Sequence, residues 1–322
     1  MNCTELKRRS MQVGAALLLG LASLVATAQE RYPSRPIEFI VPWGPGGGAD
    51  QVARKAGKIM EEDLKISFPV VNVPGATGNS GMAKLLAAQA DGYSISVMTW
   101  DTYALLATSK TRWSMKDIVP VALMIKQPSS FMSAANGNLK TWADVEREAR
   151  VRPLKVAVTG FGSPDDITVN FFAARGLKLI SVPFANPGER YTSVLGGHAD
   201  LLYEQLGDVR SFIDSKQIQP VIIFSDKRFS VFPDVPASKE LGYDITLPQR
   251  RAVIVKAGTD AGKIKVLSEA LAKVAASAEY KAYLKEQYAS DDSYFAAQDA
   301  AKIMEEELDQ MRRMAAPGAA TK

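Results

Sequence analysis

Two glycine-rich turns, each between a short apolar run and a helical pattern, constrain this chain most. The stretch Ile37–Asp50 reads IEFIVPWGPGGGAD, and its echo Val70–Gly81 reads VVNVPGATGNSG. Each apolar run is typical of a buried strand. Glycine leaves main-chain N–H groups accessible and permits positive φ, and N–H groups at a helix N-terminus favour an anion. The two turns predict a small anion cradle that carries no formal positive charge.

The same alternation of strands and helices continues along the chain and predicts an α/β architecture with parallel sheets. Strands are predicted at Ile37–Val41, Phe68–Asn72, Ile95–Met98, Val119–Ile125, Lys155–Val158, Leu179–Val182, Asp200–Leu202, Pro220–Phe224 and Ala252–Val255. Helices are predicted at Ala49–Leu64, Ser80–Ala90, Trp142–Ala149, Asp166–Arg175, Arg190–Leu195, Val209–Ser215, Asp260–Ala276, Glu279–Tyr288 and Ala296–Met314.

The first 28 residues have the features of a signal peptide. A basic segment, Lys7–Arg9, precedes the apolar run Met11–Val25, and Ala26–Ala28 is an A-x-A cleavage signal. We therefore expect a periplasmic protein whose mature chain begins at Gln29. An uncleaved membrane anchor is the alternative, but the run is shorter than the roughly 20 residues that a span needs. The only cysteine, Cys3, precedes the apolar run, so it is not a lipoprotein cysteine.

Composition argues against several function classes. A net charge of +4 is too small to indicate nucleic-acid binding. The single histidine, His198, has no thiol or carboxylate pair beside it in the sequence and is read as a surface turn residue. G-x-S-x-G, H-E-x-x-H and Walker lysine motifs are absent from the sequence. We expect no catalytic residue, no metal and no cofactor.

The segment Gly44–Ala49 also matches the loose G-x-G-x-x-A pattern of dinucleotide-binding turns. The second strand, however, runs into Asn72-Val73-Pro74, without the acidic residue that ribose hydroxyls require. A plain tight turn is the other alternative to a turn that binds a small anion.

The chain resembles the solute-binding receptors of the tripartite tricarboxylate transporter family, the Bug-type periplasmic proteins. The likeness rests on PWGPGGGAD, NVPGATGNSG, VPFANPGERYTSVLGGHADLLYEQ, FPDVPASKELGY and VKAGT. It implies a two-domain periplasmic binding protein (type II-like) with a ligand cleft between domains joined by two hinge crossings. Domain 1 would comprise residues 29–128 and 250–322, and domain 2 residues 129–249.

The resemblance also implies a function. The protein would capture a small organic carboxylate, either a di- or tricarboxylate, an aromatic acid or an amino acid, and deliver it to the transporter's membrane subunits. A periplasmic sensor of the same fold is an alternative, and an α/β enzyme is a weaker one.

Candidate ligand-binding residues lie at strand ends and turns. Asp50 is either a helix cap or a ligand contact, and Trp43 either walls the cleft or packs in the core. The same two alternatives, capping and ligand binding, apply to the second turn. The predicted set in the first domain is Trp43, Gly46, Gly47, Gly48, Asp50, Thr77, Gly78, Asn79, Thr99 and Trp100. The resemblance adds Gly160, Gly162, Ser163, Phe184, Tyr203 and Glu204 in the middle domain.

Two departures from the family pattern bear on the ligand. Gln249-Arg250-Arg251 stands where aromatics are frequent, and Ala185-Asn186-Pro187 replaces a basic-glycine pattern. Arg250, or else Arg251, is predicted to bind a distal carboxylate as a bidentate fork; a solvent-facing ion pair is the alternative. The acidic residues Asp165, Asp166, Glu189 and Glu204 either favour a ligand that bears an amine or pair with the arginines.

Overall fold

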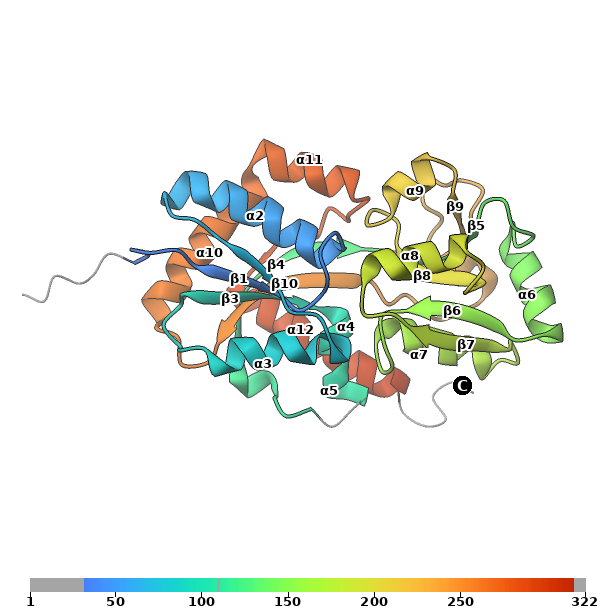
Figure 1. Ribbon diagram of the computed structural model, residues 1–322, viewed down its shortest axis with the longest axis horizontal. Helices are drawn as coiled ribbons and strands as arrows, with labels where there is room; N and C mark the ends of the chain where they lie inside the picture. Colours follow the sequence, from blue (N-terminus) through green and yellow to red (C-terminus); the bar gives the residue numbers. More distant parts are fainter. Residues whose placement is uncertain (1–31, 109–110, 316–322) are drawn as a thin grey trace, which may run out of the picture. The chain divides into compact units, whose positions relative to one another are not determined.

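The computed structural model describes residues 32–108 and 111–315 (Figure 1). The described residues from Arg35 onward belong to one compact unit, and everything that follows concerns this unit. The predicted signal peptide, residues 1–28, lies outside the described residues. Among the described helices, none has both the length and the apolar character that a bilayer crossing requires.

The first sheet is built from both ends of the unit. Its strand order is β11-β4-β10-β3-β1-β2, with β1 (Glu38–Val41), β2 (Val70–Asn72), β3 (Ser94–Thr99), β4 (Ile118–Gln127), β10 (Gln249–Lys256) and β11 (Phe295–Ala296). Its helical segments are α2 (Gly48–Leu64), η1 (Ala76–Gly78), α3 (Asn79–Ala87), α4 (Trp100–Tyr103), α5 (Leu105–Thr108), η2 (Met115–Asp117), α10 (Ala261–Ala276), α11 (Ala278–Glu286) and α12 (Ala297–Ala315).

The second sheet comes from the middle of the chain, drawn green to yellow in Figure 1. Its order is β7-β6-β8-β5-β9, with β5 (Ser129–Ala134), β6 (Leu154–Val158), β7 (Leu179–Pro183), β8 (Leu201–Gln205) and β9 (Ile218–Ile223). Its helical segments are α6 (Trp142–Val151), α7 (Pro164–Ala173), α8 (Pro187–Leu195), α9 (Arg210–Asp214) and η3 (Lys239–Leu241).

The α/β fold with two sheets is confirmed, and the expected parallel pairing holds for part of each sheet: β1 with β2 and β3, and β6 with β7 and β8. The chain passes between the sheets twice, from β4 directly into β5 and again just before β10. Both β5 and β10 lie antiparallel to their neighbours. A strand that enters a sheet straight from another sheet has no crossover helix to turn it parallel. β5 was not predicted because its sequence, SSFMSA, is rich in serine. Ser130 is nevertheless buried, and its Oγ donates to Ile222 O at 2.8 Å.

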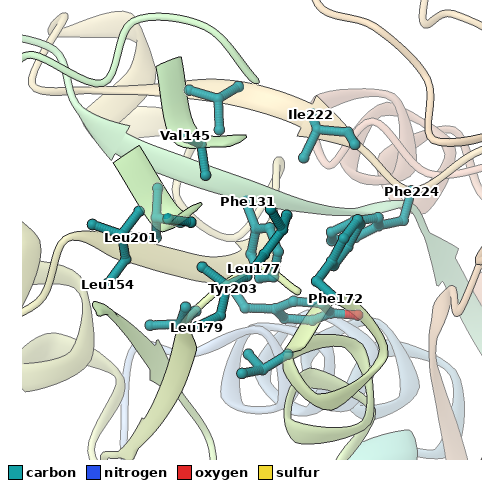
Figure 2. Packing of buried hydrophobic residues seen from close by; sticks show 14 of the residues in the cluster. Phe131, Val145, Leu154, Phe172, Leu177, Leu179, Leu201, Tyr203, Ile222 and Phe224 are labelled. Carbon is teal, nitrogen blue, oxygen red and sulfur yellow. The ribbon is translucent and has the colours of Figure 1, made fainter. Parts of the chain in front are cut away.

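An aromatic cluster forms much of the core of the second sheet (Figure 2). Phe131 of β5 lies edge-on to Phe224, with ring centroids 5.0 Å apart. Tyr203 of β8 stacks on Phe224 at 5.6 Å, and Phe172 of α7 packs against Phe131 at 5.8 Å. Such pairs stabilise a core by about 0.5–1.5 kcal/mol beyond the area they bury. The cluster therefore gives the second sheet a rigid base for the loops at its strand ends.

Candidate functional site

A small cavity lies where strand ends of the two sheets meet. From the first sheet and its loops it is lined by Trp43, Gly47, Gly48, Thr99, Asp101 and Arg251. From the second sheet and its loops it is lined by Thr159, Pro187, Arg190, Glu204, Gln205 and Asp208. We call this the inter-sheet cavity. Its volume is about 20 Å³, which is room for about one water molecule. In α/β proteins, ligands bind beyond the carboxyl ends of the strands, so the cavity is the candidate binding site.

The first glycine turn places the N-terminus of α2 at this cavity. Gly47 is the N-cap of α2 and forms no side-chain cap. The Gln51 N–H donates to Gly47 O at 3.0 Å, so the helical pattern begins there. The first N–H groups of a helix have no carbonyl acceptor within that helix and are available to bind an anion. Gly48 and Ala49, at this N-terminus, both line the inter-sheet cavity.

The same turn also permits close approach of the second sheet's elements. A Cβ added at Gly47 would lie 2.7 Å from Pro187 Cγ, at the start of α8. A Cβ added at Gly48 would overlap Asp208 Oδ2 and Arg251 Nη2. Glycine is therefore required at Gly48 by the buried side chains that face it.

Asp50 shapes this turn. Its carboxylate accepts hydrogen bonds from Gly46 N at 3.0 Å, Arg54 Nε at 2.9 Å and Asn72 Nδ2 at 3.0 Å. Burial alone would raise the pKa of Asp50, but the bonds from Arg54, Gly46 and Asn72 outweigh burial and lower that pKa. Asp50 and Gly46 lie outside the cavity lining, and the Asp50 carboxylate bonds to Gly46 within the turn.

Two predicted residues form one wall of the cavity. Trp43 is 5% exposed, and its Nε1 donates to Thr99 Oγ1 at 2.9 Å. Thr99 is also the N-cap of α4 and accepts from Thr102 N. The indole and the threonine thereby fix each other at the ends of β1 and β3.

The second glycine turn packs against protein and does not line the cavity. Gly78 has φ +86°, and a Cβ there would overlap Thr102 Oγ1. A Cβ at Gly160 would overlap Thr77 Oγ1, so this turn meets the β6–α7 loop. Asn79 Oδ1 accepts from Trp113 Nε1 at 2.8 Å. The single cradle expected from two turns is therefore replaced by one turn at the cavity and one turn at a contact between loops.

Residues of the β6–α7 loop mainly cap α7. Ser163 is the N-cap and accepts from Asp166 N, while its Oγ donates to Gly160 O at 2.7 Å. Gly162 N donates to Asp166 Oδ2 at 2.9 Å, and Gly162 O accepts from Thr108 Oγ1 at 2.9 Å. Phe184 packs at the edge of the cluster that contains Tyr191. Ser163, Gly162 and Phe184 lie outside the cavity lining, and Thr159 is the contribution of the β6–α7 loop to it.

Tyr203 and Trp100 are placed in the two cores. Tyr203 belongs to the aromatic cluster of the second sheet, because successive residues of a strand face opposite sides. Its neighbour Glu204 faces the cavity instead. Trp100 packs in the core of the first sheet, and its Nε1 donates to Glu307 of α12.

The same alternation separates the two consecutive arginines of β10. Arg250 Nε donates to Glu307 Oε1 at 2.8 Å, away from the cavity. Arg251 lines the cavity and donates to Asp208, Gln127 and, at 3.2 Å, Gln205. Of the two candidates, Arg251 lines the inter-sheet cavity and Arg250 does not.

Sequence reasoning missed Arg190 of α8, which pairs with Glu204. It also missed Asp208, which pairs with Arg251. Burial raises the pKa of Asp208 to about 6, because the attraction of Arg251 offsets only part of that penalty. The pairs join residues 14 and 43 positions apart, and nothing local in the sequence marks them as partners. The predicted cradle without formal positive charge therefore contains two buried arginines. Within residues 32–108 and 111–315, no group of three or more His, Cys, Asp or Glu side chains is placed to hold a metal ion.

Comparison with known proteins identifies the family. The tripartite tricarboxylate transporter family receptor profile matches residues 52–316. A UPF0065 protein from the TAR-I ttuE-ttuC' intergenic region of Agrobacterium vitis is 30% identical over 253 residues, 77% of this chain and 73% of that protein. Protein BugT of Bordetella pertussis is 28% identical, over 77% of this chain and 78% of its own length.

The fold is shared with a solved structure described as R. palustris Rpa4515 with adipate. The likeness covers 90% of this chain and 98% of that chain, with a TM-score of 0.83 and 22% identity. Together with the match over most of the chain, these findings confirm the resemblance stated above. The chain belongs to the family of tripartite tricarboxylate transporter receptors.

Proposed function

We propose that this protein is an exported receptor that captures a small organic carboxylate and delivers it to the membrane subunits of a tripartite tricarboxylate transporter. One observation carries the proposal: the inter-sheet cavity combines the uncapped N-terminus of α2 with the buried guanidinium of Arg251. Helix N–H groups and a guanidinium are the two partners that a carboxylate prefers. The adipate of the Rpa4515 structure belongs to the same ligand class.

In the proposed complex, a carboxylate lies on the N–H groups of Gly48 and Ala49 and within reach of Arg251. Trp43 and Thr99 form the wall beside it. The receptor carries out no reaction: its residues bind, orient and exclude water. The attraction of the carboxylate to the helix N–H groups and to the Arg251 guanidinium is stronger in the buried cavity than in bulk water, because the dielectric constant is lower there.

We also propose that residues 29–128 with 250–322 and residues 129–249 move apart as two domains. The cavity's volume of about 20 Å³ supports this, because a dicarboxylate cannot enter unless the walls separate. The two passages between the sheets would serve as hinges. Residues 1–28 would direct export and be removed.

The proposal is tested with protein isolated from the periplasmic fraction. Intact-mass analysis is expected to give a chain that begins at Gln29, and a retained N-terminus would contradict cleavage. Thermal unfolding with a panel of di- and tricarboxylates, aromatic acids and amino acids is expected to show a raised Tm for at least one member. Unchanged Tm values across the panel would contradict capture of a carboxylate.

A further inference from the structure

Buried acidic side chains outnumber buried arginines around the inter-sheet cavity. Asp101, Asp165, Glu204 and Asp208 are each no more than 8% exposed, and so are Arg190 and Arg251. Arg190 pairs with Glu204, and Arg251 pairs with Asp208. Asp101 and Asp165 form no ion pair with any residue that the structure describes. With all six groups ionised, the set carries a net charge of −2.

Asp101 and Asp165 converge on one hydroxyl. Thr159 Oγ1 lies 2.8 Å from Asp165 Oδ2 and 3.3 Å from Asp101 Oδ1. A threonine hydroxyl has one proton to donate, so it bonds to only one of the two carboxylates at a time. Asp101 Oδ2 also accepts from Gln249 Nε2, at 2.5 Å. Thr159 N also donates to Asp165 Oδ2, at 2.8 Å. Asp165 Oδ1, in contrast, is buried and has no hydrogen-bond partner among the described residues.

Protonation reduces this imbalance without removing it. Burial raises the pKa of Asp165 well above its usual range; Asp101 adds to the rise, while Arg190 opposes it. If Asp165 is neutral, the three remaining acids still exceed the two arginines by one charge. An uncompensated buried carboxylate is strongly unfavourable relative to a paired one.

Each of the two buried arginines has an N–H donor that no described residue accepts. The Nε atoms of Arg190 and Arg251 are buried and have no hydrogen-bond partner among the described residues. A site with unused guanidinium donors and more carboxylates than arginines suits a ligand that carries both a negative group and a positive group. A dicarboxylate would satisfy the donors but add negative charge to a set that is already negative.

We infer that the ligand is a monocarboxylate that also carries a cationic nitrogen, which is held by Asp101 in the lining of the inter-sheet cavity. This inference rests on the proposed function and narrows its ligand class. The carboxylate lies on the Gly48 and Ala49 N–H groups, and the ammonium group lies against Asp101 and Thr159. Asp165 acts through Thr159 as a positioning residue, because it does not line the cavity itself.

The test compares pairs of ligands with the same methylene chain, in which one end group is either a carboxylate or an ammonium group. The chain is unfolded and refolded to remove carried-over small molecules, then titrated calorimetrically with three pairs: succinate and 3-aminopropanoate, glutarate and 4-aminobutyrate, adipate and 5-aminopentanoate. We expect the amino acid to bind at least tenfold more tightly than its matched dicarboxylate in the pair of best-fitting length. Equal or tighter binding of the dicarboxylate overturns the inference and leaves the proposed function standing. Absence of binding by every member overturns the inference, and the thermal-unfolding panel described above then decides the proposed function.

Variants test the assigned residues. Asp101→Asn and Asp165→Asn are expected to shift the amino acid-to-dicarboxylate affinity ratio at least fivefold toward the dicarboxylate. Asp166→Asn is the matched control, because Asp166 lies one position along α7 but bonds to Gly162 N and Ser181 Oγ, outside the cavity lining. An unchanged ratio in Asp101→Asn, or an equal shift in Asp166→Asn, overturns the assignment. The wild-type pair comparison decides the ligand class even where a variant fails to fold.

Discussion

Arg251 of β10 and Asp208, which follows β8, form a buried ion pair that joins the two sheets across the inter-sheet cavity. Their side chains are 4% and 1% exposed. Gln127 at the end of β4 and Gln205 at the end of β8 both bond to the same guanidinium. One side chain is thus held by strand ends from both sheets, and it lies against the glycine turn that begins α2. The pair therefore links the candidate binding site to the contact between the sheets.

Removing Arg251 is expected to be costly. Arg251→Met leaves Asp208 buried without its partner, which typically lowers the free energy of unfolding by about 3–5 kcal/mol. Urea unfolding at pH 7 measures the change. Arg147→Met is the control, because the Arg147–Asp144 pair is exposed and such pairs contribute about 1 kcal/mol or less. Equal losses in the two variants would contradict the role given to Arg251.

Asp208 is expected to make stability depend on pH. Its pKa in the folded chain is about 6, above the ordinary 3.8, so the folded chain keeps a proton that the unfolded chain has released. The contribution of Asp208 to the free energy of unfolding therefore falls as the pH rises from about 4 to about 6, by up to about 3 kcal/mol. The measurement is the free energy of unfolding of wild type minus that of Asp208→Asn across this range. A difference that is flat, or that rises with pH, would show that the pKa is not raised.

Gly48→Ala is expected to damage both stability and binding. The new methyl group would overlap Asp208 and Arg251, and overpacking of this kind costs about 1–3 kcal/mol. Displacement of the pair also lowers carboxylate affinity, by at least tenfold in calorimetry. Gly188→Ala in α8 is the control, since no neighbouring atom lies within 4 Å of its added Cβ. Its stability should stay within about 1 kcal/mol of wild type. Wild-type affinity in Gly48→Ala would show that the turn is not at the binding site.

Substitution of Arg250 is expected to lower stability without changing carboxylate affinity, unlike substitution of Arg251. Arg250 bonds to Glu307 of α12, which also accepts from Trp100 Nε1. Arg250→Met is expected to lower the melting temperature by several degrees, because about 3 kcal/mol is lost with a buried pair. Its carboxylate affinity should stay within twofold of wild type, since Arg250 lies outside the cavity lining. A tenfold loss of affinity in Arg250→Met with no loss in Arg251→Met would reverse the assignment.

Much of the fold could be predicted because the signals are local. The apolar runs before the two glycine turns correspond to β1 and β2, and α2 begins one residue before the predicted Ala49. β5 could not be predicted, since its burial depends on partners in β8 and β9 that are far away in the sequence. The antiparallel entry of β5 and β10 likewise follows from the connection between sheets, which no local pattern encodes.

The site was only partly predictable, for a related reason. The predicted residues at or just after strand ends, or at the start of a helix, include Trp43, Gly47, Gly48, Thr99 and Glu204, and the structure brings them to the cavity. Buried arginines such as Arg190 look like surface residues in a sequence, because their counter-charges are distant along the chain. The sequence could not show which residues of Gln249-Arg250-Arg251 face the cavity, since all three residues are polar and all three are buried.

The most direct test of the account is calorimetric titration of the refolded wild-type chain and Arg251→Met, with Arg147→Met as control, against the six compounds of the matched panel. Circular dichroism first establishes that each variant is folded at the titration temperature. We expect saturable one-to-one binding of at least one carboxylate to wild type and the control, and at least a tenfold loss of affinity in Arg251→Met. Failure of every compound to bind wild type, or wild-type affinity in folded Arg251→Met, would contradict a carboxylate site between the two sheets.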